Sequence, residues 1–153
     1  MFAVLRRHFS SDSYCYDEFI GTAAIRRAHT PELRLDTEVF NRYAAQHPSI
    51  EAIVRDQIRS SVKISDFKTL SQWRHTDLYN DFFRLEGLNY QLGYLALNEG
   101  PRLGLALNRT KRDFSEEERA MFDLLLPHFL QAFQTTQLFS RLSESAEARP
   151  NKT

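Results

Sequence analysis

Apolar and polar residues alternate along two neighbouring stretches of this chain, which is the pattern of half-buried β-strands. The stretches are 90–97 and 102–109, and Asn98-Glu99-Gly100-Pro101 between them is typical of a turn. In the second stretch three leucines share one face, which predicts that this face is core. The other face carries Arg102, Gly104, Ala106 and Asn108. Its small residues favour close packing of a helix, with a ligand as the alternative.

Two more stretches have strand character and predict a second hairpin. Residues 13–19 are rich in aromatic side chains, Gly21 marks a turn, and residues 22–28 follow as the partner strand. Residues 62–64 predict a further short strand. The chain therefore predicts a β-sheet built from hairpins.

Helical spacing fills the intervals between these strands. A short helix is expected over residues 1–9, and Asp36 is a good N-cap for a helix carrying Phe40. Pro48 permits a fresh helix after it. Residues 69–84 predict two short helices, which Gly87 would end.

The C-terminal part predicts one long amphipathic helix. Ser115-Glu116-Glu117-Glu118 has the form of a capping box, and we expect the helix to run to about Ser140. Pro127 falls on its polar face, where water can satisfy the carbonyl that loses its partner, so we expect a kinked but continuous helix. The apolar stripe comprises Met121, Phe122, Leu125, Phe129, Ala132, Phe133 and Phe139.

Three leucines, Leu124, Leu130 and Leu138, lie outside this stripe. They indicate either a dimer interface or a wide contact within the chain. Residues 143–153 contain no large apolar side chain and are expected to be a disordered polar tail. The expected organisation is one domain over 1–142 followed by this tail.

Composition and charge narrow the class of protein. The chain has 153 residues with 42% hydrophobic and 26% charged residues, which is ordinary for one globular domain. Twenty basic residues balance twenty acidic ones, so nothing indicates a nucleic-acid partner. No signal peptide and no membrane-spanning segment can be identified, and the single cysteine forms no internal disulfide. We therefore expect a cytoplasmic protein with no membrane partner.

No motif predicts an enzyme, a metal site or a cofactor. The five histidines show no ligand spacing with one another or with Cys15, and no Gly-rich phosphate loop or nucleophile elbow occurs. Cys15 is expected to pack in the core or at a sheet edge, because no Cys-His signature accompanies it. The acidic run at the helix start is explained by capping.

The best ligand-binding hypothesis is an aromatic pocket. Aromatic side chains with polar tips suit a small-molecule cavity, although a plain aromatic core explains them equally. With one neighbouring glutamine, the candidates are Tyr14, Tyr16, Trp73, Tyr79, Phe82, Phe83, Tyr90 and Gln91.

Several stretches, in order, resemble a known group of domains. They are 103–109, 112–119, 124–129 and 79–84 followed by Gly87, with looser likeness at 16–19 and 47–48. Over roughly 13–133 the chain resembles the GAF-like N-terminal sensor domains of LuxR-type helix-turn-helix transcription regulators in bacteria. The tryptophan/tyrosine/aspartate signature of the related acyl-homoserine-lactone receptors is not evident, so no ligand is named.

The resemblance implies an α+β fold of GAF/PAS type, with an antiparallel sheet between helices. It implies a dimeric sensor of an unknown small molecule, with no DNA binding by this chain because no helix-turn-helix is present. The expectation is therefore a fragment, an isolated sensor domain or a remnant of a regulator. The alternative is a stand-alone interaction module that forms heterodimers with full-length regulators and binds no ligand.

Overall fold

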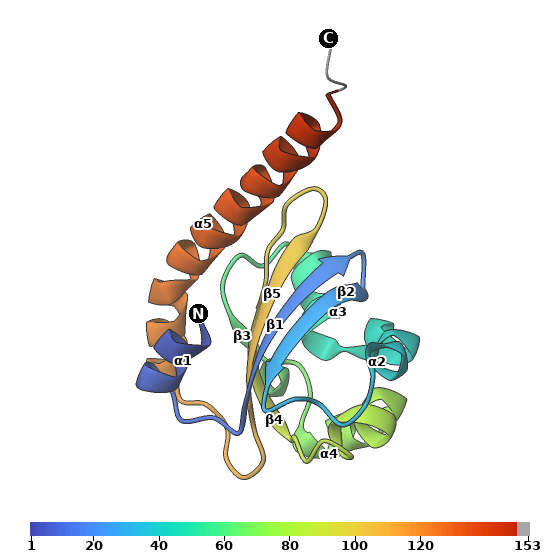
Figure 1. Ribbon diagram of the computed structural model, residues 1–153. Helices are drawn as coiled ribbons and strands as arrows, with labels where there is room; N and C mark the ends of the chain where they lie inside the picture. Colours follow the sequence, from blue (N-terminus) through green and yellow to red (C-terminus); the bar gives the residue numbers. More distant parts are fainter. Residues whose placement is uncertain (150–153) are drawn as a thin grey trace.

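The computed structural model describes residues 1–149 and has a five-stranded antiparallel sheet at its centre (Figure 1). Its strand order is β2-β1-β5-β4-β3. The two predicted hairpins are present, and β1 of the first pairs with β5 of the second. The strands are β1 (Ser13–Ile20), β2 (Ala23–Thr30), β3 (Val62–Lys63), β4 (Tyr90–Leu95) and β5 (Arg102–Arg109).

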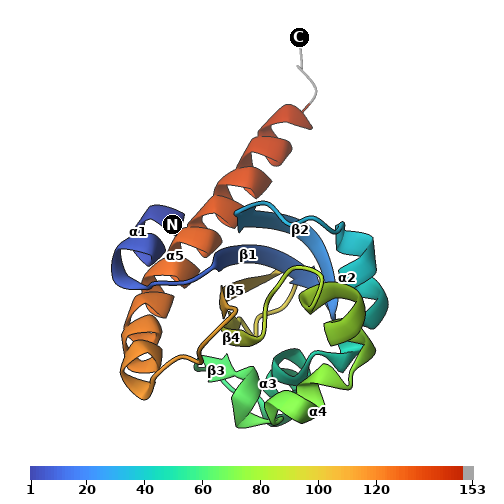
Figure 2. The same ribbon diagram turned by 90° about the horizontal axis from the view of Figure 1, so that it is seen from below.

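Helices cover both faces of the sheet (Figures 1 and 2). On one face lie α1 (Phe2–His8) and α5 (Glu116–Glu147). The other face carries α2 (Thr37–Tyr43), α3 (Pro48–Asp56), α4 (Leu70–Arg74) and a π-helical turn at Tyr79–Phe83. Short 3₁₀ turns occur at Ala44–Gln46 and Ile64–Asp66. This confirms the predicted antiparallel sheet with helices on its faces and a long C-terminal helix.

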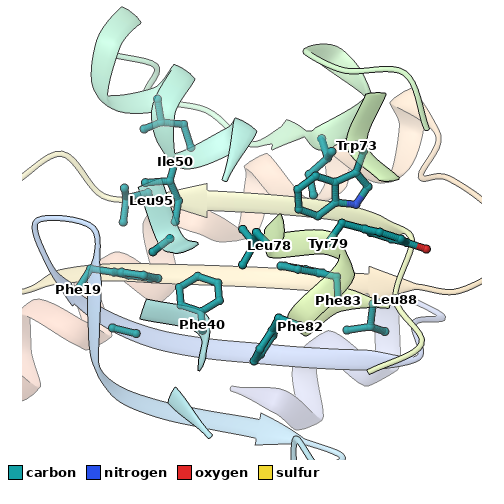
Figure 3. Packing of buried hydrophobic residues seen from close by; sticks show 14 of the residues in the cluster. Phe19, Phe40, Ile50, Trp73, Leu78, Tyr79, Phe82, Phe83, Leu88 and Leu95 are labelled. Carbon is teal, nitrogen blue, oxygen red and sulfur yellow. The ribbon is translucent and has the colours of Figure 1, made fainter. Parts of the chain in front are cut away.

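The period of two along each strand divides the interior into two cores. Phe19, Leu95 and the helical aromatics Phe40, Trp73, Phe82 and Phe83 form the core beneath α2, α3 and α4 (Figure 3). Leu103, Leu105 and Leu107 point to the opposite face, where they pack with Leu5 and Phe122. The prediction that the leucine face of β5 is core is confirmed. The sheet therefore separates two apolar layers.

The start of α5 is set by the expected capping box. The Ser115 hydroxyl accepts from the Glu118 amide at 3.1 Å, and the Glu118 carboxylate accepts from the Ser115 amide at 2.8 Å. The helix is continuous through Pro127, which is exposed, so that water can satisfy the orphaned carbonyl.

The predicted end of α5 is wrong. The helix continues to Glu147 instead of ending near Ser140, so 143–147 is helical and not a disordered tail. Ser, Glu and Ala continue a helix at little cost, and no Gly or Pro interrupts this segment before Pro150. The expectation of disorder for 150–153 lies outside the described residues.

The buried face of α5 differs in part from the predicted stripe. Phe122, Leu126 and Phe133 are buried, and Leu125 and Phe129 pack beside them, whereas Met121 and Phe139 are exposed. The stripe is therefore narrower than the sequence predicts. Its distal part is exposed because the helix extends beyond the sheet (Figure 1).

The three candidate interface leucines fall into two groups. Leu124 is 76% exposed and Leu138 is 55% exposed, so both are free of the chain's own core. Leu130 is partly buried and packs against the α5-side core, so it contributes to the contact within the chain. Phe139 and Leu142 add exposed apolar area near Leu138.

An ion pair anchors α5 to the sheet. Arg109 of β5 is buried and donates to both carboxylate oxygens of Glu118, and its guanidinium lies 4.0 Å from the Phe114 ring centroid.

None of the helices within residues 1–149 combines the length and apolarity needed to cross a bilayer.

Candidate ligand cavity

A cavity of about 50 Å³ lies between the sheet and helices α2 and α3. This is room for a few water molecules or a compact organic group, since a water needs roughly 10–15 Å³ of such space. Its walls are mostly apolar, and Phe40, Ile50, Ile53, Phe82 and Leu95 are among them. Its floor is formed by side chains of β1, β2, β4 and β5 that point toward the helices.

The floor is unusually polar, and a β-bulge explains why. Without the bulge, the pairing next to the β1–β2 turn would place Arg26 and Ala28 opposite Asp17 and Cys15. The register shifts by one residue between Glu18 and Phe19, so Asp17 pairs with Arg27 and Cys15 pairs with His29. Paired residues of an antiparallel ladder share a face. All four side chains therefore reach the cavity.

These four side chains form one hydrogen-bonded chain. The Cys15 sulfur lies 3.2 Å from His29 Nδ1, and His29 Nε2 lies 2.8 Å from Asp17 Oδ1. Arg27 Nε donates to the same Asp17 oxygen at 2.8 Å. The result is a thiol, an imidazole, a carboxylate and a guanidinium linked in series.

Amide and hydroxyl groups extend the chain across the sheet. Asn108 Nδ2 lies 3.3 Å from the Cys15 sulfur and 3.0 Å from the Ser13 hydroxyl. Gln91 Nε2 in turn donates to Asn108 Oδ1 at 3.0 Å. Neighbouring strands thus hold the sulfur among polar groups.

The charges on the cavity floor are defined by burial and by these contacts. Burial raises the pKa of the Cys15 thiol to about 12, so the thiol is protonated at neutral pH. Burial also opposes ionisation of Asp17, but the hydrogen bond from His29 and the charge of Arg27 outweigh it and lower the carboxyl pKa. Burial lowers the pKa of His47 to about 4 and keeps it neutral. The Asp17–Arg27 ion pair is the resulting charged element.

Two buried polar atoms at the cavity lack a partner among the described residues. They are Arg27 Nη1 and the Ser49 hydroxyl, and both side chains line the cavity. The Arg27 side chain is 9% exposed, and its guanidinium lies 4.4 Å from the Phe40 ring centroid. Buried polar groups without a partner are costly, so these two atoms are the unsatisfied polar positions of the cavity wall.

Only some residues of the predicted aromatic pocket line the cavity. Phe82, Phe83 and Gln91 line the cavity, while Trp73 and Tyr79 lie behind Phe83 as core (Figure 3). Tyr14 and Tyr16 pack on the α5 side of the sheet, because they alternate with the cavity-facing residues of β1. Tyr90 is likewise absent from the cavity walls.

Sequence reasoning missed the polar floor. Cys15 was expected to pack in the core or at a sheet edge and is buried, but no role was assigned to Asp17, Arg27 or His29. His47 was also passed over, although its Nδ1 caps α3. The only available signal was the run of polar residues at alternate positions in the first hairpin.

The small face of β5 meets a side chain at Gly104 and the cavity at Ala106. A Cβ on Gly104 would lie 2.5 Å from Phe19 Cε2, so a neighbouring strand's ring occupies this space, not a helix. Ala106, further along β5, lines the cavity.

Within residues 1–149, no group of three or more His, Cys, Asp or Glu side chains is arranged to hold a metal ion.

Comparison with known proteins identifies the fold. No protein-family model matches the chain, and no curated protein sequence matches it. One similar structure is the LBD domain of VqsR from Pseudomonas aeruginosa, with TM-score 0.63 and 20% identity, covering 84% of this chain and 78% of that one. Another is the GAF domain of a two-component sensor histidine kinase from Bacillus halodurans, with TM-score 0.64 and 15% identity, covering 91% and 92%. The chain has a GAF-like fold.

Proposed function

We propose that this chain is the signal-sensing domain of a LuxR-type transcription regulator and binds a small molecule between the sheet and helices α2 and α3. The observation that carries the proposal is the polar floor of the cavity. Arg27 Nη1 of this floor and the Ser49 hydroxyl of α3 have no partner among the described residues, and most of the remaining cavity wall is apolar. A few placed polar groups in an apolar enclosure are the usual features of a small-molecule site.

The cavity also limits the ligand. Pockets for drug-sized molecules occupy roughly 300–1,000 Å³, far more than the 50 Å³ found here. The ligand is therefore compact, or the helices over the cavity move outward as it enters. The resemblance of residues 13–133 to LuxR-type sensor domains, together with the fold likeness to the VqsR LBD domain, supports a sensory and not a catalytic role.

We further propose that the domain forms a homodimer through α5. The helix protrudes beyond the sheet, and Leu138, Phe139 and Leu142 are exposed along this part of it (Figure 1). Contiguous exposed apolar side chains favour association. Sedimentation velocity is expected to show a dimer for wild type. The double variant Leu138→Glu/Phe139→Glu is expected to be a monomer with the circular dichroism spectrum of wild type. A wild-type monomer would contradict the homodimer.

A stand-alone interaction module is the second candidate. The same exposed face of α5 and the small size of the cavity favour it, because neither requires a ligand. It predicts that the chain co-purifies with a full-length LuxR-type relative. Failure to co-purify would remove it.

The test of the sensory proposal is a thermal-shift screen of a metabolite library against wild type and Ala106→Leu. The leucine fills the cavity from β5, whereas Ala28→Leu on exposed β2 is the matched control. We expect at least one compound to raise the melting temperature of wild type and the Ala28 variant but not of Ala106→Leu. A shift that persists in Ala106→Leu would place the ligand elsewhere, and no shift for any compound would favour the interaction module.

A further inference from the structure

Cys15, His29 and Asp17 have the arrangement of a thiol, a base and an orienting acid. His29 Nε2 lies 2.8 Å from ionised Asp17, so it carries the proton and donates it to the carboxylate. In the neutral ring the lone pair of His29 Nδ1 then faces the Cys15 sulfur, 3.2 Å away. This is the nucleophile–base–orienter geometry that activates a thiol.

A second, independent feature points to a reacting molecule at this place. Arg27 lines the same cavity as Cys15, and its side chain is only 9% exposed. Its Nη1 atom is a donor without a partner among the described residues. A guanidinium that lines the same cavity as a nucleophile can stabilise negative charge that develops on an oxygen. A structural role for the ion pair alone explains Arg27 Nε but not the free Nη1.

From these observations we propose that the cavity captures small α,β-unsaturated carbonyl compounds covalently at Cys15, with His29 as the base. The inference rests on the proposal that the cavity receives a ligand, and it names the chemical class of that ligand. The reaction is stoichiometric capture and not turnover, which is compatible with a sensor.

The step is an addition in which atoms and electrons balance. The S–H bond breaks and its proton moves to His29 Nδ1, while the sulfur electron pair forms a bond to the β-carbon of the C=C bond. The π electrons shift toward the carbonyl oxygen, which accepts a hydrogen bond from Arg27 Nη1. The proton on His29 then passes to the α-carbon, so no oxidant, reductant or leaving group is needed.

The state of the thiol makes the base essential. Burial raises the pKa of Cys15 to about 12, so almost no thiolate exists at neutral pH. Capture therefore depends on proton transfer as the S–C bond forms, and it favours compounds that fit the cavity. A compact enone such as methyl vinyl ketone fits this description, whereas N-phenylmaleimide is too bulky for about 50 Å³.

The test uses methyl vinyl ketone and intact-protein mass spectrometry at pH 7. Because the chain has one cysteine, a Cys15→Ser variant identifies the adduct as the thiol's. We expect one adduct on wild type and none on Cys15→Ser. His29→Gln should react about 100-fold more slowly, which is the low end of general-base assistance. His75→Gln, at an exposed histidine, is the matched control and should react like wild type.

A second measurement covers the case in which His29→Gln does not fold. With methyl vinyl ketone, native wild type should react about tenfold faster than the same protein unfolded in urea. With N-phenylmaleimide, native wild type should react more slowly than the unfolded protein. An inert buried cysteine would react more slowly with both compounds when native, and that result would overturn the proposal. If Cys15→Ser still shows reversible thermal shifts with other compounds, the sensory function stands and only covalent capture fails.

Discussion

The joint between α5 and the sheet makes a quantitative prediction about acid stability. Glu118 accepts two hydrogen bonds from buried Arg109, and this contact lowers its pKa from 4.5 to about 2. In the unfolded chain the carboxyl has its ordinary pKa. Between pH 4.5 and pH 2 the unfolded state therefore takes up a proton that the folded state does not. The stabilisation is complete above pH 4.5 and is lost as the pH falls toward 2.

The size of the effect follows from the same shift. The difference between 4.5 and about 2 corresponds to roughly 3 kcal/mol at neutral pH. The Glu118 side chain is 23% exposed, so solvent screening reduces this, and we expect Glu118→Gln to cost about 2 kcal/mol. Glutamine retains the capping role and removes only the charge. Arg109 keeps its bonds to the Ser10 and Asp113 carbonyls, which limits the loss.

Urea unfolding followed by circular dichroism at pH 7, 5, 4 and 3 measures the effect. The gap in unfolding free energy between wild type and Glu118→Gln should be about 2 kcal/mol at pH 7 and should narrow below pH 4.5. Glu117→Gln, exposed in the same helical turn, should cost about 0.5 kcal/mol through the helix dipole alone. Equal losses for the two variants, or a gap independent of pH, would refute the reasoning.

Three further predictions concern packing and His47. Phe122→Ala removes a fully buried ring in contact with Phe9 and should lower the unfolding free energy in urea by about 3–5 kcal/mol. Met121→Ala, at an exposed position, should lower it by less than about 1 kcal/mol. Equal losses would contradict the observed buried face of α5. His47 is buried with a pKa near 4, so its contribution is complete above pH 6.5 and is lost as the pH falls toward 4. His47→Asn keeps an N-cap but has no such titration, so its stability gap from wild type should shrink over that range; a constant gap would contradict the shift. Gly104→Ala forces a methyl group against Phe19 and should cost about 1–3 kcal/mol, whereas Gly93→Ala, with 3.4 Å to its nearest atom, should cost less.

The fold was predictable because each element has a local signal. The capping box fixed the start of α5, and the alternation around the turn at 98–101 identified the β4–β5 hairpin. The antiparallel sheet with helices on both faces follows from those elements and from the resemblance. The end of α5 was not predictable in the same way, because residues 141–147 carry neither a helix stop nor an apolar stripe.

The candidate site was predictable only in part. The helical spacing of residues 69–84 predicted that Phe82 and Phe83 belong to one aromatic group, and both line the cavity. The polar floor of the cavity, in contrast, depends on a single β-bulge. Shifting a strand by one residue exchanges its faces. A hairpin without the bulge would put exposed Arg26, and not Arg27, beside Asp17. Nothing in the composition of 22–28 fixes that choice, so the Cys15–His29–Asp17 chain becomes visible only in three dimensions.

The central claim is that the cavity binds a small molecule through its unpartnered polar groups, and a calorimetric titration of Ser49→Ala tests it most directly. The Ser49 hydroxyl is buried without a partner among the described residues, so removing it should leave the unfolding free energy unchanged or slightly higher. With the strongest compound from the thermal-shift screen, wild type should bind one molecule per chain, and Ser49→Ala should bind it up to about tenfold more weakly. Equal affinity for the two proteins, or no saturable binding to wild type, would contradict the account.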